Sequence, residues 1–248
     1  NDLYYVSLAD SANLGYLTSN RKGSLFIEKE SCCNDIYAFE KIEECICVRQ
    51  DSLYQQIDLN LPLSLYFHND EPNPNTRDSV TDVNYSQAFE SFYSKKEDYV
   101  FKFGEVLSGR LKGQAENQMA SFFEQEVAGG YVQLQKFGAQ LELAMELEAK
   151  VSINVKGFSS PLTSEDYNQQ LSKRRISSVL NYLTAYNNGV LKTYIENGSI
   201  KIYELSLGET KVDLEVSDNP NNLRKSVYSI SASRERRIDI QSILMEWQ

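Results

Sequence analysis

The stretch that decides the fold is Asn168-Gln169-Gln170-Leu171-Ser172-Lys173-Arg174-Arg175-Ile176-Ser177-Ser178-Val179-Leu180-Asn181-Tyr182-Leu183. Wound at about 100° per residue, its apolar side chains fall in one broad arc, which predicts a helix from about 164 to 186 packed on a core. Asn168 and Arg175 lie near the middle of that arc. Arg174 is placed on the solvent side, together with Gln170, Lys173, Ser177 and Asn181.

Arg175 therefore needs an anion, because an unpaired buried charge costs several kcal/mol. Its planar guanidinium suits a carboxylate. Two interpretations stay open: an internal ion pair with an Asp or Glu of a neighbouring loop, or a cleft where Arg175 binds a ligand carboxylate that Asn168 helps to orient. Thr163 and Asp166 have capping-box spacing, and the N–H groups of a helix start favour an anion, which supports the cleft.

Outward from this helix, strands alternate with helices. Strands are expected at 61–67, 151–155, 200–205 and 238–243, and a short helix at 223–233. Aromatic residues at helical spacing predict paired helices over 85–103 and 114–126, and Gly129-Gly130 begins a third. The aromatic stripe indicates packing, with a partner surface as the alternative. Without the helical insertion at about 76–128, the order is β-α-β-α-β-α-β, an α/β (α+β) fold with a mixed sheet covered by helices.

Residues 1–55 are rich in alternation and turns, with strands expected around 4–8, 15–19 and 34–39 and a further one at Cys45–Val48. The cysteines are Cys32, Cys33, Cys45 and Cys47. Their spacing is unlike the C-x2-C of metal sites, which favours disulfides between strands, and hence an oxidising compartment, over free thiols or a metal. Asn1 to Tyr5 read like the inside of a strand, so upstream segments are expected.

Composition limits the class of function. The chain has 248 residues, 41% of them hydrophobic, enough for a sizeable core, and a net charge of −10, which argues against nucleic acid. No apolar run is long enough to span a membrane as a helix. His68 is the single histidine, and no phosphate-binding motif occurs. A non-enzymatic protein without cofactor or metal is expected.

Three blocks resemble the OmpA-like C-terminal family. Gly157-Phe158-Ser159-Ser160 stands at its G-Y-T-D, the stretch from Asn168 to Leu183 follows N-x-x-L-S-x-x-R-A-x-x-V-x-x-Y-L, and Arg236-Arg237-Ile238-Asp239-Ile240 follows R-R-V-E-I. The resemblance covers 56–248. Residues 1–55 resemble the last blade of a TolB/PD40-like β-propeller, with Gly15–Arg21 before Asp35-Ile36-Tyr37. A lone blade cannot bury both faces, so earlier blades are expected; the alternative is a small β-rich cap on the next domain.

The resemblance implies a peptidoglycan-binding anchor in a Gram-negative periplasm, associated with the outer membrane and other envelope proteins. The family binds the diaminopimelate of the stem peptide with the Asp of G-Y-T-D and the Arg of the helix motif. Arg175 stands at the base position and Ser160 at the acid position, and a serine cannot neutralise an ammonium. The ligand-binding residues implied are Ser160, Asn168, Leu171, Arg175 and Arg236.

Asp70, Glu165 and Asp166 are candidates for the missing acid. The alternative function is a protein-interaction scaffold, in a periplasmic or secretion-type complex, that has lost peptidoglycan binding because of Ser160.

Overall fold

The structure is a computed structural model that describes residues 3–8, 14–19, 35–40, 46–159, 163–209, 219 and 221–247. The chain divides into two compact units, Asn1–Arg49 and Gln50–Gln248. In the first unit, β1 (Leu3–Leu8), β2 (Leu14–Ser19) and β3 (Asp35–Glu40) form an antiparallel sheet in the order β1-β2-β3. These are the strands that the alternation predicted.

The strand predicted at Cys45–Val48 is wrong, because α1 (Ile46–Asp58) begins there. The short apolar run belongs to the first turn of this helix. Further along the helix, Leu53 and Ile57 are four residues apart and both buried, which is the spacing of a helix that packs on a core. The disulfides predicted among the four cysteines involve side chains outside the described part of the structure.

The second unit contains a four-stranded mixed sheet, as the sequence predicted. Its strands are β4 (Leu63–Tyr66), β5 (Ala149–Ser159), β6 (Ile200–Glu209) and β7 (Arg237–Trp247), in the order β4-β7-β5-β6. β5 and β6 are parallel, whereas β7 runs antiparallel to both β4 and β5. The last strand of the chain therefore lies between the first and the second strand of this unit.

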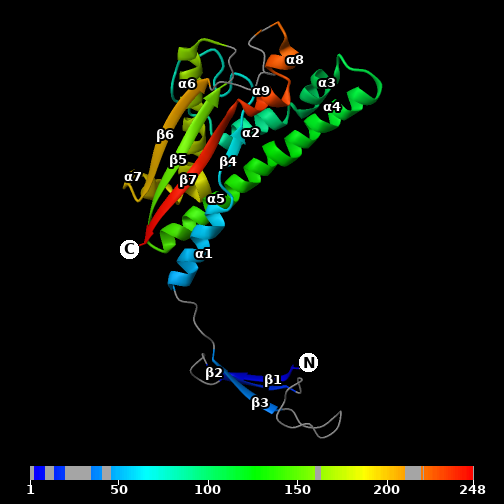
Figure 1. Cartoon of the computed structure of the whole chain (residues 1–248). Coiled ribbons are helices and arrows are strands. Elements are labelled where there is room, and N and C mark those ends of the chain that lie inside the picture. The colour runs from blue at the N-terminus through cyan, green and yellow to red at the C-terminus, as the bar shows by residue number, and fades with distance from the viewer. Residues whose placement is uncertain are drawn as a thin grey trace. The chain divides into compact units, whose positions relative to one another are not determined.

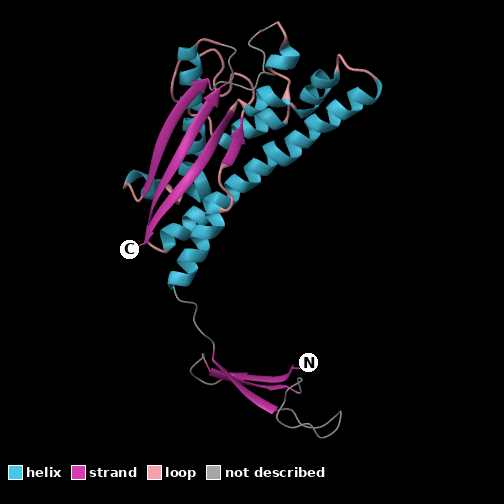
Figure 2. Ribbon diagram, in the orientation of Figure 1, coloured by secondary structure: helices cyan, strands magenta, loops and turns pink. Residues whose placement is uncertain are grey.

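Helices cover one face of this sheet (Figures 1 and 2). Val151, Ile153 and Val155 on β5 point into the main core, while Lys150 before them and Asn154 between them are exposed. The main core joins these valines and isoleucine to side chains of α5 (Gly129–Glu146) and α6 (Glu165–Gly189). Alternation along β5 thus gives the sheet a helix-covered face and an open face.

The insertion between β4 and β5 contains α2 (Tyr85–Tyr93), α3 (Lys96–Gly104), α4 (Gly109–Phe122) and the π-helical turn η1 (Phe123–Ala128). The helix predicted to begin at Gly129-Gly130 is α5, which does begin at Gly129, and it follows α4 and η1 without a break from Gly109 to Glu146. Gly129 keeps helical dihedral angles, φ −57° and ψ −45°, so the glycine pair does not end the helix.

The aromatic stripe of the insertion is internal packing, as predicted. Phe92, Tyr99 and Phe123 are fully buried in a second cluster, with ring centroids 4.9 to 5.4 Å apart. Tyr66 of β4 and Val227 belong to the same cluster, which therefore ties the insertion to the sheet and to the segment before β7.

The remaining helices differ in detail from the predictions. α6 begins after Ser164, whose side chain accepts a hydrogen bond from Tyr167 N, so the capping box predicted at Thr163 is wrong by one residue. The helix predicted at 223–233 is divided into α8 (Leu223–Ser226) and α9 (Ile230–Arg234), and α7 (Lys192–Glu196) was not predicted. None of the described helices is both long and apolar enough to cross a bilayer.

Candidate functional site

The helix α6 is buried on two sides, and this arrangement determines the site. One side packs on the sheet through the apolar arc. The opposite side is covered by the segment 72–83, because Ser177 and Asn181 donate hydrogen bonds to the carbonyl of Thr81. The prediction that Arg174 faces solvent is therefore wrong: its side chain is fully buried. Polar residues on this side of α6 form hydrogen bonds with the backbone of the covering loop. A helical-wheel projection does not distinguish such residues from residues exposed to water.

Arg174 binds that loop entirely through backbone groups. Its guanidinium donates to the carbonyls of Pro72, Thr76 and Asp78 at 3.1, 2.7 and 2.8 Å. The same group lies 5.4 Å from the ring centroid of Tyr167. A charged donor satisfies each of these carbonyls, so Arg174 fixes the loop against α6.

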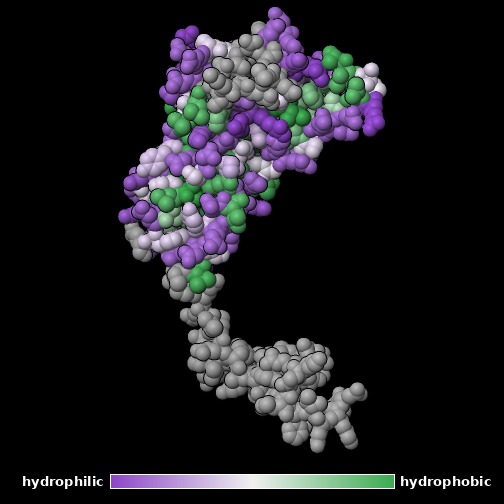
Figure 3. Space-filling view, in the orientation of Figure 1, coloured by the Kyte–Doolittle hydropathy of each residue, from purple (hydrophilic) through white to green (hydrophobic). Residues whose placement is uncertain are grey.

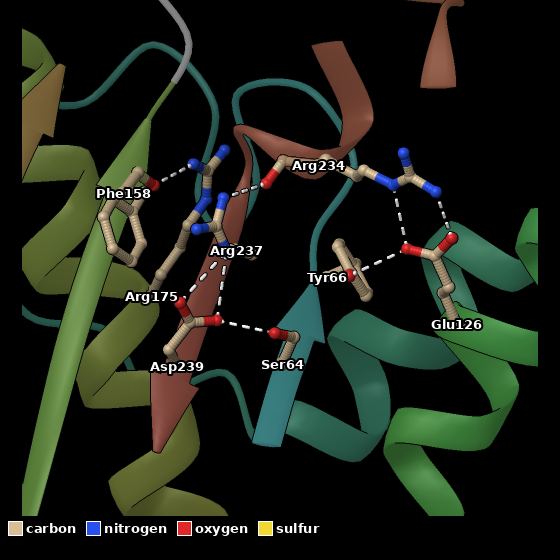
Figure 4. Close-up of polar contacts among 8 residues, drawn as sticks. All are labelled: Ser64, Tyr66, Glu126, Phe158, Arg175, Arg234, Arg237 and Asp239. Carbon is tan, nitrogen blue, oxygen red and sulfur yellow. Dashed lines mark hydrogen bonds and ion pairs between the residues drawn. The ribbon is translucent and has the colours of Figure 1, made fainter. Parts of the chain in front are cut away.

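Arg175 is also fully buried but has fewer partners. Nε donates to the Glu71 carbonyl at 3.1 Å and Nη1 to the Phe158 carbonyl at 2.9 Å, at the end of β5 (Figure 4). Nη2 is buried without a hydrogen-bond partner. Burial and then the positive charge of Arg236 lower the pKa of Arg175 to about 9, while the negative charge of Asp70 opposes this shift. Arg175 therefore stays cationic at neutral pH.

The internal ion pair considered for Arg175 finds no partner in the part of the chain that the structure describes. No carboxylate there lies within 4.0 Å of the guanidinium of Arg174, Arg175 or Arg236. All three side chains are fully buried. A buried cation that meets only neutral groups is a costly arrangement, and an anion placed beside it would be strongly favoured.

Arg236 lies in the second cluster. Nη2 donates to the Val227 carbonyl at 2.8 Å, to Ser233 Oγ at 3.0 Å and to Tyr99 Oη at 3.2 Å, and the buried Nε has no partner. Arg236 influences Arg175 through its positive charge, which lowers the pKa of Arg175.

Arg237 takes the other face of the sheet. Its guanidinium stacks over the Phe158 ring at 4.3 Å and pairs with Asp239 at 3.0 Å (Figure 4). Asp239 also accepts a hydrogen bond from Ser64 at 2.7 Å. The consecutive arginines of the last block thus point to opposite faces of the sheet, one toward the helices and one toward the open side.

His68 is partly buried and contacts Tyr99 and Phe92 of the second cluster. Nδ1 is 2.9 Å from the Tyr99 hydroxyl, which also accepts a hydrogen bond from Arg236. Burial and then the charges of Arg236, Lys95 and Arg175 lower the pKa of His68 to about 3. His68 therefore stays neutral at neutral pH.

The other predicted ligand residues are placed as follows. Asn168 is buried, and its side-chain amide bonds to Thr163, donating to the carbonyl at 3.1 Å and accepting from the hydroxyl at 2.5 Å. Leu171 is buried with 5% of its surface exposed. Ser160 lies outside the described residues. Asn168 therefore fixes Thr163 at the start of α6.

Among the acids considered as substitutes for Ser160, Asp70 is beside the site. Its carboxylate accepts from the Tyr167 hydroxyl and from Asn75 N, and its charge acts on Arg175. Glu165 and Asp166 are exposed in the first turn of α6. Sequence reasoning missed the role of Tyr167, which contacts both Asp70 and Arg174.

Three surface grooves are described, and Arg175 lines none of them. One, of about 760 Å³, lies between α4 and the segment 224–234. Another of about 480 Å³ lies beside β6, and one of about 260 Å³ lies near Tyr66 and Arg237. Within the described ranges, no three His, Cys, Asp or Glu side chains converge as a metal-binding group. Comparison of the chain with protein-family models, curated proteins and solved structures finds no match.

Proposed function

We propose that the second unit binds the stem peptide of peptidoglycan and thereby anchors an outer-membrane-associated complex non-covalently to the cell wall. One observation carries the proposal: Arg175 is a buried cation with no described carboxylate within 4.0 Å and with Nη2 unpartnered. A ligand carboxylate would supply the missing anion and accept from the free nitrogen.

The order of elements supports the OmpA-like part of the proposal. In the second unit, β4, β5, β6 and β7 are separated by helices, which gives β-α-β-α-β-α-β when the helices of each connection are taken together. Arg175 lies on the helix after β5, and Arg236 directly precedes β7. These positions are the ones at which the resemblance to the OmpA-like family places the helix block and the last-strand block of the sequence.

In this proposal Asp70 replaces the family acid that is missing at Ser160. Diaminopimelate presents an ammonium beside its carboxylate, so a binding site requires a negative group near the arginine. The Asp70 carboxylate acts electrostatically on Arg175, is partly exposed, and is held by Tyr167 and Asn75. Glu165 and Asp166 point to solvent in the first turn of α6 and remain available to other partners.

Co-sedimentation with insoluble diaminopimelate-type peptidoglycan tests the proposal. Wild-type protein should sediment with the polymer, and Arg175→Met should stay in the supernatant. Arg174→Met is the matched control, since it removes a neighbouring buried guanidinium that backbone carbonyls already satisfy. It should still sediment under conditions where circular dichroism shows that both variants are folded. Failure of the wild type to sediment would refute the anchor.

A protein-interaction scaffold is the second candidate function. The observation that favours it is the groove of about 760 Å³ on the insertion, where Arg224, Lys225 and Arg234 outnumber the single acid Glu126. A scaffold would leave the wild type in the supernatant in the peptidoglycan assay. Charge reversal at Lys225, exposed in this groove, would then reduce assembly with an acidic partner.

A further inference from the structure

The outer edge of β6 carries free backbone hydrogen-bonding groups. β6 is the last strand in the order β4-β7-β5-β6 (Figure 2). Val151 N donates to the Ser199 carbonyl at 2.8 Å, and Val151 is the register partner of Ile200. In a parallel pair this pattern directs the N–H and C=O groups of Ile200, Ile202 and Glu204 away from β5. In the described structure no strand pairs with them.

A groove of about 480 Å³ runs beside the same residues on the helix side of the sheet. Leu180 of α6, Ile195 of α7 and Ile202 give it a mainly apolar lining, and Lys201 and Glu204 of β6 also line it. On the open side, β6 exposes Tyr203, Leu205 and Leu207, with 54%, 48% and 39% of their surface accessible. Figure 3, which views the open face, shows hydrophobic side chains among hydrophilic ones over the strands.

We propose that this edge binds an extended peptide segment of a partner protein, which adds a strand to the sheet. Another extended backbone would pair with the alternate donors and acceptors of Ile200, Ile202 and Glu204 together. Side chains of such a strand alternate between its faces, so one set enters the apolar groove and the other covers Tyr203 and Leu205. The segment therefore has small apolar residues on the groove side and no charge at its centre.

A second copy of the chain fits this edge less well. Antiparallel pairing of β6 with itself, centred on Ile202 or Tyr203, brings Glu204 of one copy opposite Ile200 or Ile202 of the other. The carboxylate of the second copy then lies at the same groove as the chain's own Glu204, where burying a further acidic group is unfavourable. Centring the pair on Glu204 places two carboxylates opposite each other, which is also destabilising. A partner strand that is apolar at these positions avoids both problems.

The test uses the full chain and a capped peptide of alternating valine and threonine with lysines at its C-terminus, followed by NMR. Binding should shift the amide signals of β6 and slow hydrogen exchange at Ile202 and Glu204. The same peptide with alternate amides N-methylated is the control, and it should not bind because it cannot pair with the edge. Equal binding of both peptides, or no binding of either, would overturn the proposal.

Matched variants locate the contact. Leu205→Asn on β6 and Ile195→Asn in the groove should each weaken peptide binding by about tenfold. Leu244→Asn should leave it unchanged, because Leu244 is similarly exposed, at 55%, but lies on β7, with β5 between it and the edge. An equal loss with Leu244→Asn would contradict edge pairing. A concentration-dependent dimer in sedimentation, abolished by Leu205→Asn, would assign the edge to a second copy and overturn the partner peptide.

Discussion

At the scale of single residues, Arg174 and Arg175 are adjacent, equally buried and differently used. Three carbonyls of the 72–78 loop receive the hydrogen bonds of Arg174, whereas Arg175 has two carbonyl partners and one unpartnered nitrogen. The hydrogen bonds of Arg174 are thus all made within the protein and hold the loop. The second is the one that an external anion would complete.

This difference predicts different costs of removing each charge. Arg174→Met leaves three carbonyls without their charged donor and should lower the free energy of unfolding by about 3 kcal/mol. Arg175→Met also removes a buried cation that has no counter-ion, so its cost should be clearly smaller. Urea unfolding monitored by circular dichroism measures both values. A larger loss for Arg175→Met would mean that this side chain serves mainly the fold.

His68 makes stability depend on pH. Its pKa is lowered to about 3 in the folded protein, against an ordinary value near 6.5, so the unfolded chain binds the proton more readily. Its contribution is fully present above pH 6.5 and is lost as pH falls toward 3. Between pH 6.5 and 5.5 the wild type should lose about 1 kcal/mol more than His68→Gln. Identical pH profiles in urea unfolding would contradict this assignment.

At the scale of elements, close contact between α5 and β4 depends on one glycine. A Cβ on Gly130 would stand 2.5 Å from the Ser64 carbonyl oxygen, whereas at Gly129 the nearest atom would be 3.9 Å away. Backbone cannot yield as a flexible side chain does. The helix therefore lies against the edge of the sheet only because residue 130 has no side chain.

The two glycines provide a matched pair of variants. Gly130→Ala should lower the free energy of unfolding by about 2 kcal/mol or more through this clash. Gly129→Ala should raise it by about 0.5 kcal/mol, because alanine is the better helix former and the position has helical dihedral angles. Thermal melting of both variants, compared with the wild type, measures these two changes in stability. Destabilisation of similar size by both changes would refute the close-approach explanation.

Element type was predictable from the sequence wherever periodicity was strong. The strands of both sheets and the helix carrying Arg175 follow from alternation and helical spacing. One failure has a particular cause. Cys45–Val48 is a short apolar run that belongs to a helix, and Gly129-Gly130, which begins α5 as predicted, provides close packing inside a continuous helix. Short apolar runs and glycine pairs are locally ambiguous, so tertiary contacts decided both cases.

The candidate site was only partly predictable for the same reason. That Arg175 is buried follows from its place in the apolar arc. That Arg174 is also buried depends on the 72–83 loop, whose position no local pattern encodes. The link from Asp70 through Tyr167 to Arg174 likewise joins residues far apart in the sequence.

At the scale of the whole molecule, the second unit places its buried arginines between the sheet, α6 and the loop after β4. The chain is acidic, with a net charge of −10, yet this interior region concentrates positive charge. Such a contrast favours a small anionic group over a nucleic acid or a large anionic surface. It is also consistent with an anchor that grips one end of a peptide.

Titration calorimetry with free meso-diaminopimelate tests most directly whether Arg175 is held for an external carboxylate. The full chain should bind it, Arg175→Met should bind at least about tenfold more weakly, and Asp70→Asn should lose the preference for diaminopimelate over pimelate, which lacks the ammonium groups. Equal affinity of wild type and Arg175→Met, or no heat of binding with the wild type, would contradict the account.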